Sequence, residues 1–226
     1  MSIVSIIIWL FVLLLAITVH EAAHGWAALR LGDPTAYNLG RVSLNPVAHI
    51  DPIGTVLVPL ILVLVGAPPF GWAKPVPVNP YNLRRPRQDN LWISAAGPLA
   101  NLTVAALALI GIVLLKLLAP GLSEFLHDFL LQRRSLPPGL YPLRGLAVIL
   151  FYLTLTNVYL AVFNLIPVPP LDGSGVLMGL LSHEAGLRYE RLRPFGFLIV
   201  LGLIYLGVLQ IIIRPIEIFI YTVVFL

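Results

Sequence analysis

The chain has 226 residues, of which 59% are hydrophobic and only 11% are charged, whereas soluble domains are typically about 45–50% apolar and about 25% charged. This composition excludes a soluble domain and predicts an integral membrane protein. The formal charge of +4 requires no nucleic-acid partner, because a few basic loop residues that face anionic lipid account for it, and the lack of cysteine excludes disulfides and thiolate metal ligands.

Five apolar stretches are long enough to reach far into a bilayer, which requires about 20 residues. They are Ile3–Val19, continuing as a helix to Leu29, then Ile53–Phe70, Trp92–Leu115, Gly145–Ile166 and Phe195–Ile213. An apolar tail, Ile216–Leu226, follows Arg214-Pro215 and is either a sixth short element or the continuation of a kinked helix. We therefore expect residues 1–226 to form one all-α membrane domain, a polytopic helical bundle of five to six membrane segments with short extended loops.

The connections between these stretches have distinct patterns. In the first, Arg41-Val42-Ser43-Leu44 alternates between polar and apolar residues and could form a short strand. In the second, three prolines within six residues follow Lys74, so the chain is expected to be extended there. In the third, apolar residues from Leu122 to Leu130 recur at helical spacing opposite charged ones, which predicts an amphipathic helix in the membrane interface.

A short motif near the end of the first stretch, His20-Glu21-Ala22-Ala23-His24, is the most informative part of the sequence. Residues four apart share one face of a helix, so His20 and His24 can bind one metal ion together. Glu21 can act as a base beside a metal-bound water. Two imidazoles and a carboxylate are costly at membrane depth, which favours a functional site over a chance match.

The third ligand of a zinc site with an open water position is expected to be Asp172. It follows the uncharged residues Gly145 to Leu171, and the prolines at 167, 169 and 170 prevent a regular helix before it. Irregular backbone at membrane depth is tolerated only where it is buried or lines a water-filled cavity, and a hydrolase needs such a cavity. By itself, Asp172-Gly173 would more readily indicate a turn.

Other polar residues are assigned structural roles. We interpret His49, His127 and His183 as solvated or capping residues rather than ligands, since each lies in or near a polar loop. Asp33 and Asp51 precede or begin proline turns and are expected to hold those turns.

Three segments together resemble the site-2 protease family, which consists of intramembrane zinc metallopeptidases. They are His20 to His24, Ala95-Ala96-Gly97-Pro98-Leu99-Ala100-Asn101, and Asn164 to Gly173, in the order expected of the family. The chain resembles a minimal form without PDZ or CBS domains. The resemblance implies one Zn²⁺ on His20, His24 and Asp172, with Glu21 as general base. It also implies that Asn164 positions the substrate or stabilises the oxyanion, although Asn164 could instead cap freed backbone groups.

The ligands restrict the topology. His20 lies 17 residues after Ile3, about 25 Å along the helix and so near its far end. Asp172 would end on the opposite side if Ile53–Phe70 crossed the membrane fully. We therefore expect that segment to be re-entrant, or a hairpin bent at Pro59 and Pro68-Pro69.

The distribution of basic residues supports the same topology. With a re-entrant segment, nine of the 14 basic residues share the side of the ligands: Arg30, Arg41, Lys74, Arg84, Arg85, Arg87, Arg188, Arg191 and Arg193. By the positive-inside rule, that side is cytoplasmic, the active site opens toward it, and the N-terminus is outside.

The expected function is hydrolysis of peptide bonds within or near transmembrane segments of other membrane proteins, with those substrates and the lipid bilayer as partners. The proline-rich loop or the re-entrant segment could pair with an unwound substrate by β-addition.

A non-catalytic zinc-containing scaffold or chaperone would need a closed four-ligand site, and no fourth ligand is evident. A metal transporter would need acidic or histidine residues on several spans, and these are nearly lacking.

Overall fold

The computed structural model describes residues 3–64, 71–119, 121–131 and 142–225, and within these ranges it contains helices and no strand. Four helices are long and apolar enough to cross a membrane: α1 (Ile3–Arg30), α4 (Pro86–Leu118), α6 (Pro142–Asn164) and α10 (Val208–Phe225). Shorter helices are α2 (Thr35–Asn38), α3 (Val58–Leu64), α5 (Leu122–Leu131), α7 (Asp172–Leu180), α8 (His183–Glu190) and α9 (Gly196–Tyr205). The structure confirms the all-α polytopic architecture.

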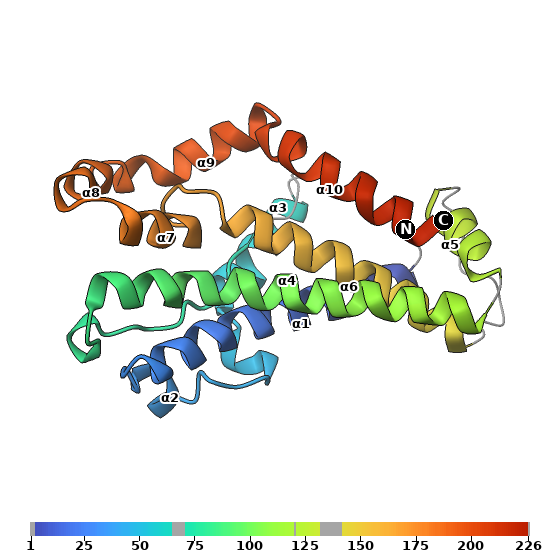
Figure 1. The fold of residues 1–226 in the computed structure, drawn as a ribbon, viewed down its shortest axis with the longest axis horizontal. Coiled ribbons are helices and arrows are strands. Elements are labelled where there is room, and N and C mark those ends of the chain that lie inside the picture. The colour runs from blue at the N-terminus through green and yellow to red at the C-terminus, as the bar shows by residue number, and fades with distance from the viewer. Residues whose placement is uncertain (1–2, 65–70, 120, 132–141, 226) are drawn as a thin grey trace.

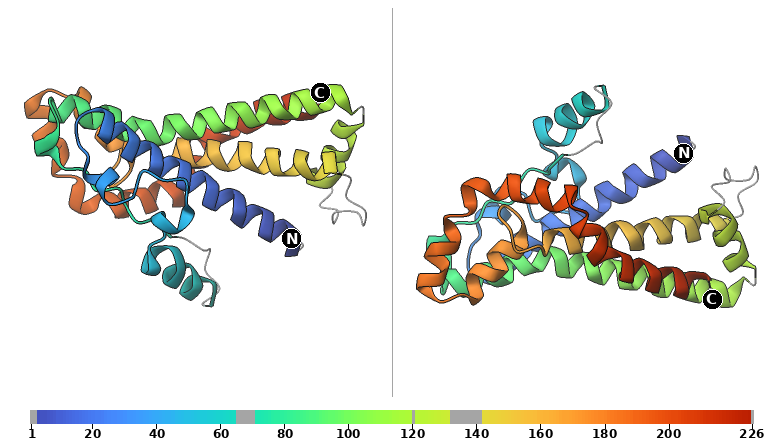
Figure 2. Two further views of the ribbon diagram at one scale, coloured as in Figure 1. Left: turned by 90° about the horizontal axis from the view of Figure 1, so that it is seen from below. Right: turned by 90° about the horizontal axis from the view of Figure 1, so that it is seen from above.

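The helices α4, α6 and α10 run side by side toward one end of the molecule, where α5 covers them (Figure 1). Ile112 of α4, Val148 of α6 and Val224 of α10 are fully buried there, and Leu126 of α5 packs against them. The amphipathic segment is therefore helical as predicted, but its apolar face is buried in the bundle. Toward its N-terminus, α1 diverges from α4 and α6 (Figure 2).

The apolar stretch Phe195–Ile213 is not one element. Helix α9 ends at Tyr205, and α10 begins at Val208 after Gly207, whose φ of 72° favours glycine and breaks the helix. Helix α10 then continues through Pro215 to Phe225. Of the two alternatives for the C-terminal tail, the structure shows continuation of a helix.

The segment Arg41–Leu44 does not form the short strand considered above. Its chain bends instead, because the ring of His49 bonds the Ser43 carbonyl (2.8 Å) and the Arg41 guanidinium donates to the carbonyls of Ala48, Lys74 and Pro75. Only 2% of the surface of His49 is exposed, so the solvated alternative is wrong, whereas the bond between its ring and the Ser43 carbonyl fits the capping alternative.

The proline-rich loop is extended from residue 71 to 79, as predicted. Hydrogen bonds fix it along its length: the Lys74 amide donates to the His49 carbonyl (2.9 Å), and the Asn79 amide donates to the Asp33 carboxylate (2.7 Å). Asp51 accepts from the amides of Ile53 and Gly54. Asp33 and Asp51 therefore hold turns, as the sequence predicts.

Hydrogen bonds join the two ends of the segment that is expected to be re-entrant. The Trp72 amide donates to the Gly54 carbonyl (3.2 Å), and the Thr55 hydroxyl donates to the Trp72 carbonyl (2.8 Å). A π-helical segment (Pro52–Leu57), which contains Gly54 and Thr55, leads into α3, and α3 lies beside the bundle (Figure 2). The bend at Pro68-Pro69 lies outside the described residues. A segment whose ends are hydrogen-bonded together cannot connect two membrane faces, which supports the re-entrant prediction.

We expect the fold to lose stability in acid through Asp33, which is fully buried. Burial raises the pKa of Asp33, but hydrogen bonds from Asn82, Thr35 and Asn79 outweigh it and lower the pKa below 3.8. Stabilisation from the ionised carboxylate is thus present above pH 3.8 and lost as the pH falls through the folded-state pKa. Asp33→Asn should lower the free energy of unfolding by about 1–3 kcal/mol at pH 7. In thermal unfolding over a series of pH values, it should also reduce the loss of stability at acid pH. Glu190→Gln, an exposed control, should show the same loss of stability at acid pH as the parent.

Candidate metal centre

Three side chains from two helices meet at one point. His20 and His24 lie one helical turn apart on α1, both buried, with their Nε2 atoms 3.1 Å apart. Asp172 is the first residue of α7, and its Oδ2 lies 3.0 Å from His20 Nε2 and 3.3 Å from His24 Nε2. In the part of the chain that is described, this is the only group of three His, Asp or Glu residues placed to hold a metal ion.

The partners of the two imidazoles fix their protonation. His20 Nδ1 lies 2.5 Å from Asn101 Oδ1, and His24 Nδ1 lies 2.7 Å from the Ile93 carbonyl oxygen. Both partners are acceptors, so each Nδ1 carries the proton and each Nε2 of a neutral ring presents a lone pair. Asp172 Oδ2, which faces them, is buried and accepts no hydrogen bond from any described residue. Three lone-pair atoms this close repel one another unless a proton or a metal ion lies between them, and neutral rings leave the place to a metal ion.

The spacing of these atoms is close to that of a zinc site. Zinc bonds of about 2.0–2.2 Å in a tetrahedral site separate the ligand atoms by about 3.3–3.6 Å, and the separations here, 3.0, 3.1 and 3.3 Å, lie at or just below the lower end of that range. Two nitrogens and one oxygen are the donor set of catalytic zinc sites that keep a position for water. The residues present therefore fit the metal that the sequence predicts.

A chain of buried amides joins His20 to the rest of the bundle. Asn101 of α4 donates to Asn157 Oδ1 of α6 (2.7 Å) and to the Ala16 carbonyl of α1 (3.0 Å), which fixes its own oxygen toward His20. Asn157 in turn donates to the Leu153 carbonyl (2.8 Å). These contacts hold the imidazole in one orientation from two neighbouring helices.

Close approach of α4 to the ligands depends on Gly97. A Cβ atom at this position would lie 2.4 Å from His24 Nε2 and 2.7 Å from His20 Nε2. No real side chain reaches such distances, so only glycine leaves room for both rings here.

Asp172 is positioned by glycines on α7. A Cβ at Gly175 would lie 2.1 Å from Ser94 Oγ, and one at Gly179 would lie 2.5 Å from the Leu91 Cβ. Small residues four apart let α7 pack tightly on α4, as in other membrane helix pairs. The loop 165–171 before it is non-helical, as its prolines predict.

The two residues proposed to take part in catalysis are placed differently. Glu21 is partly exposed beside His20, interacts electrostatically with His24, and has no hydrogen bond or ion pair in the described residues. Asn164 ends α6 and donates to the Leu160 carbonyl of its own helix (2.9 Å). That contact matches the capping alternative, and the catalytic role of Asn164 stays a prediction.

Sequence reasoning missed part of this site. Asn101 lies within a segment singled out above, but without a role, and Asn157 was not identified. Asn157 could have been found, because an amide within an otherwise apolar span is a costly group that calls for a partner. The Ile93 carbonyl carries no signal in the sequence.

Similarity to known proteins extends over most of the chain. The family model described as "Peptidase family M50" matches residues 8–206. The chain is 37% identical over 191 residues to YwhC of Bacillus subtilis strain 168, whose name assigns it to the zinc metalloproteases, and the match covers 84% of this chain and 77% of YwhC. Rip2 of Mycolicibacterium smegmatis, assigned by name to the same class, is 28% identical over 84% of this chain and 64% of its own length. No solved structure matches. The chain therefore belongs to peptidase family M50, the site-2 protease family.

Proposed function

We propose that this protein is an intramembrane zinc endopeptidase that cleaves other membrane proteins within or near their transmembrane segments. The observation that carries the proposal is the group of three lone-pair atoms on His20, His24 and Asp172, inside a chain of four apolar helices. A scaffold with a structural zinc would need a fourth protein ligand, and the described residues place three in the group.

The chemistry follows from the residues around the ligands. When bound, zinc supplies a Lewis acid that polarises the scissile carbonyl and lowers the pKa of water toward about 7. Glu21 takes a proton from the attacking water as its oxygen adds to the carbonyl carbon. The carbon–nitrogen bond then breaks, and Glu21 delivers that proton to the leaving amine. Asn164, at the end of α6, is the candidate for holding the substrate carbonyl.

The substrate must be unwound before cleavage, because a helix keeps its carbonyls in its own hydrogen bonds. The extended loop offers an edge for β-addition, since in the described structure the Val76 amide and carbonyl have no hydrogen-bond partner.

We further propose that the active site opens to the cytoplasm and that the N-terminus lies outside. The joined ends at Gly54 and Trp72 support this, because they keep the basic loops on one side.

Purified protein in liposomes, given a panel of single-span membrane proteins, tests the proposal. We expect cleavage of some members, loss of cleavage with a zinc chelator, and recovery when zinc is added back. Cleavage that persists in the chelator after the metal has been removed would contradict the proposed function.

A further inference from the structure

The three metal ligands are supported in different ways. The rings of His20 and His24 are each held through Nδ1 by a neighbouring oxygen atom. Apart from these two rings, no described residue forms a hydrogen bond or an ion pair with the Asp172 carboxylate. Metal ligands generally need such contacts to keep their orientation. The position of Asp172 therefore depends on the backbone around it, which is the loop 165–171 and the first turn of α7.

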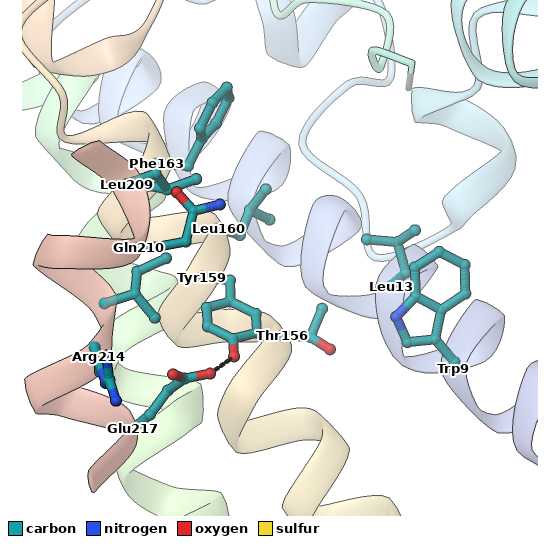
Figure 3. A pocket seen from close by; sticks show the side chains of 11 residues that line it. Trp9, Leu13, Thr156, Tyr159, Leu160, Phe163, Leu209, Gln210, Arg214 and Glu217 are labelled. Atoms are coloured by element: carbon teal, nitrogen blue, oxygen red, sulfur yellow. Dashed lines mark hydrogen bonds between the residues drawn. The ribbon is translucent and has the colours of Figure 1, made fainter. Parts of the chain in front are cut away.

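Apolar packing keeps this loop in the bundle. Ile166 and Leu171 pack against Val200 of α9 in a buried cluster. Phe163 and Leu209 extend the cluster to the wall of a cavity between α1, α6 and α10 (Figure 3). Because hydrophobic burial is non-directional, these contacts hold the loop without fixing the direction of the ligand that follows it.

The backbone of the loop also lies against the beginnings of two helices. A Cβ atom at Gly173 of α7 would overlap the carbonyl oxygen of Leu165, and one at Gly196 of α9 would overlap that of Pro169. Both positions therefore require glycine. These contacts limit how far the loop can move toward either helix, but they do not attach it to one of them.

A single hydroxyl group links the chain before Asp172 to the chain after it. Tyr189 of α8 donates to the Pro167 carbonyl (3.0 Å), and the Ser174 side chain of α7 interacts with the same hydroxyl. Pro167 lies five residues before Asp172, and Ser174 lies two residues after it. Since hydrogen bonds are directional, these contacts fix the loop relative to α7 in a way that apolar packing does not.

Helix α8 is held in place independently of the Tyr189 hydroxyl. Ser182 caps its first turn by accepting from the Ala185 amide (3.3 Å). Gly186 is buried against α7, where a Cβ atom would lie 3.1 Å from the Met178 sulfur. The hydroxyl is therefore carried by a helix whose own position does not depend on it.

From these contacts we propose that Tyr189 is a positioning residue that holds Asp172 against the two imidazoles, because it joins the loop before this ligand to the helix after it. This rests on the proposed function, since it concerns the same metal centre, but it predicts an effect on metal binding rather than on cleavage. Tyr189 acts through the backbone, so loss of its hydroxyl should weaken zinc binding without abolishing it.

Tyr189→Phe tests this role, because it removes the hydroxyl and keeps the ring. We expect zinc affinity, measured by competition with a fluorescent chelator, to fall about three- to tenfold, the usual effect of one or two hydrogen bonds. With Co²⁺ in place of zinc, the visible absorption spectrum should also change, since it depends on the geometry of the ligands. Tyr81→Phe is the matched control, because Tyr81 is 97% exposed, and it should match the parent in both measurements.

A second substitution tests the link to α7. Ser174→Ala should weaken zinc binding in the parent but add little in Tyr189→Phe, because the hydroxyl with which Ser174 interacts is then already absent. Parental zinc affinity or a parental cobalt spectrum in Tyr189→Phe would overturn the proposal. Equal effects of Ser174→Ala with and without the Tyr189 hydroxyl would overturn it as well.

These measurements are independent of protease activity. If the parent binds zinc but cleaves no membrane protein, while Tyr189→Phe weakens zinc binding, the proposed function fails and the role of Tyr189 stands. If the parent cleaves its substrates and Tyr189→Phe binds zinc with parental affinity, the role of Tyr189 fails and the proposed function stands.

Discussion

Glu21→Gln is expected to reduce cleavage by at least about 10²–10⁴-fold, the usual contribution of a general base, while zinc stays at about one ion per chain. Glutamine keeps the shape of the side chain but cannot take a proton from water. Glu21 is not among the three atoms that converge at the metal centre, so its replacement should not release the ion. The measurements are initial cleavage rate in liposomes and metal analysis on the same preparation.

Glu184→Gln is the matched control, because Glu184 is exposed on α8, outside the metal centre. It should cleave at the parental rate. Parental cleavage by Glu21→Gln would eliminate Glu21 as the base, and loss of zinc from that variant would make it a ligand instead.

Gly97→Ala is expected to weaken zinc binding by about 100-fold or more and to abolish cleavage with it. The new methyl group would lie 2.4 Å from His24 Nε2, the atom that faces the metal position, so the rings or α4 must move. Supporting contacts around metal ligands are typically worth about 10–100-fold in affinity, and here the ligands themselves are displaced. Competition with a fluorescent zinc chelator measures the affinity.

Gly111→Ala, on the same helix, separates this effect from a general change in α4. Its Cβ would meet only the Leu150 side chain, at 3.2 Å from the flexible methyl end. Alanine favours helix over glycine by about 1 kcal/mol, so this variant should bind zinc as the parent does. Gly97→Ala with parental affinity would mean that the rings are not confined as described.

The meeting of His20, His24 and Asp172 could be predicted from the sequence because helix periodicity and proline chemistry are local rules. The spacing of His20 and His24 places them on one face wherever α1 lies. The prolines before Asp172 require an irregular loop. At membrane depth such a loop must be buried or must line a water-filled cavity. The long helices could be predicted for a similar reason, since apolar length alone defines a span.

The supporting contacts depend on packing that local rules do not contain. The Ile93 carbonyl reaches His24 only because α4 lies against α1, and Gly97 allows that approach. The break at Gly207 lies inside a continuous apolar stretch, where hydropathy gives no boundary. The polar neighbours of His49 indicate a solvated or capping residue, and only the contacts between two loops show that it is buried.

The central claim, one zinc held by His20, His24 and Asp172, is tested most directly by metal analysis of purified variants. We predict about one zinc per chain in the parent and in His183→Ala, whose imidazole is exposed. His24→Ala and Asp172→Ala should each retain less than about one tenth of that amount while keeping the parental helical content. A full equivalent of zinc in folded Asp172→Ala would contradict the account.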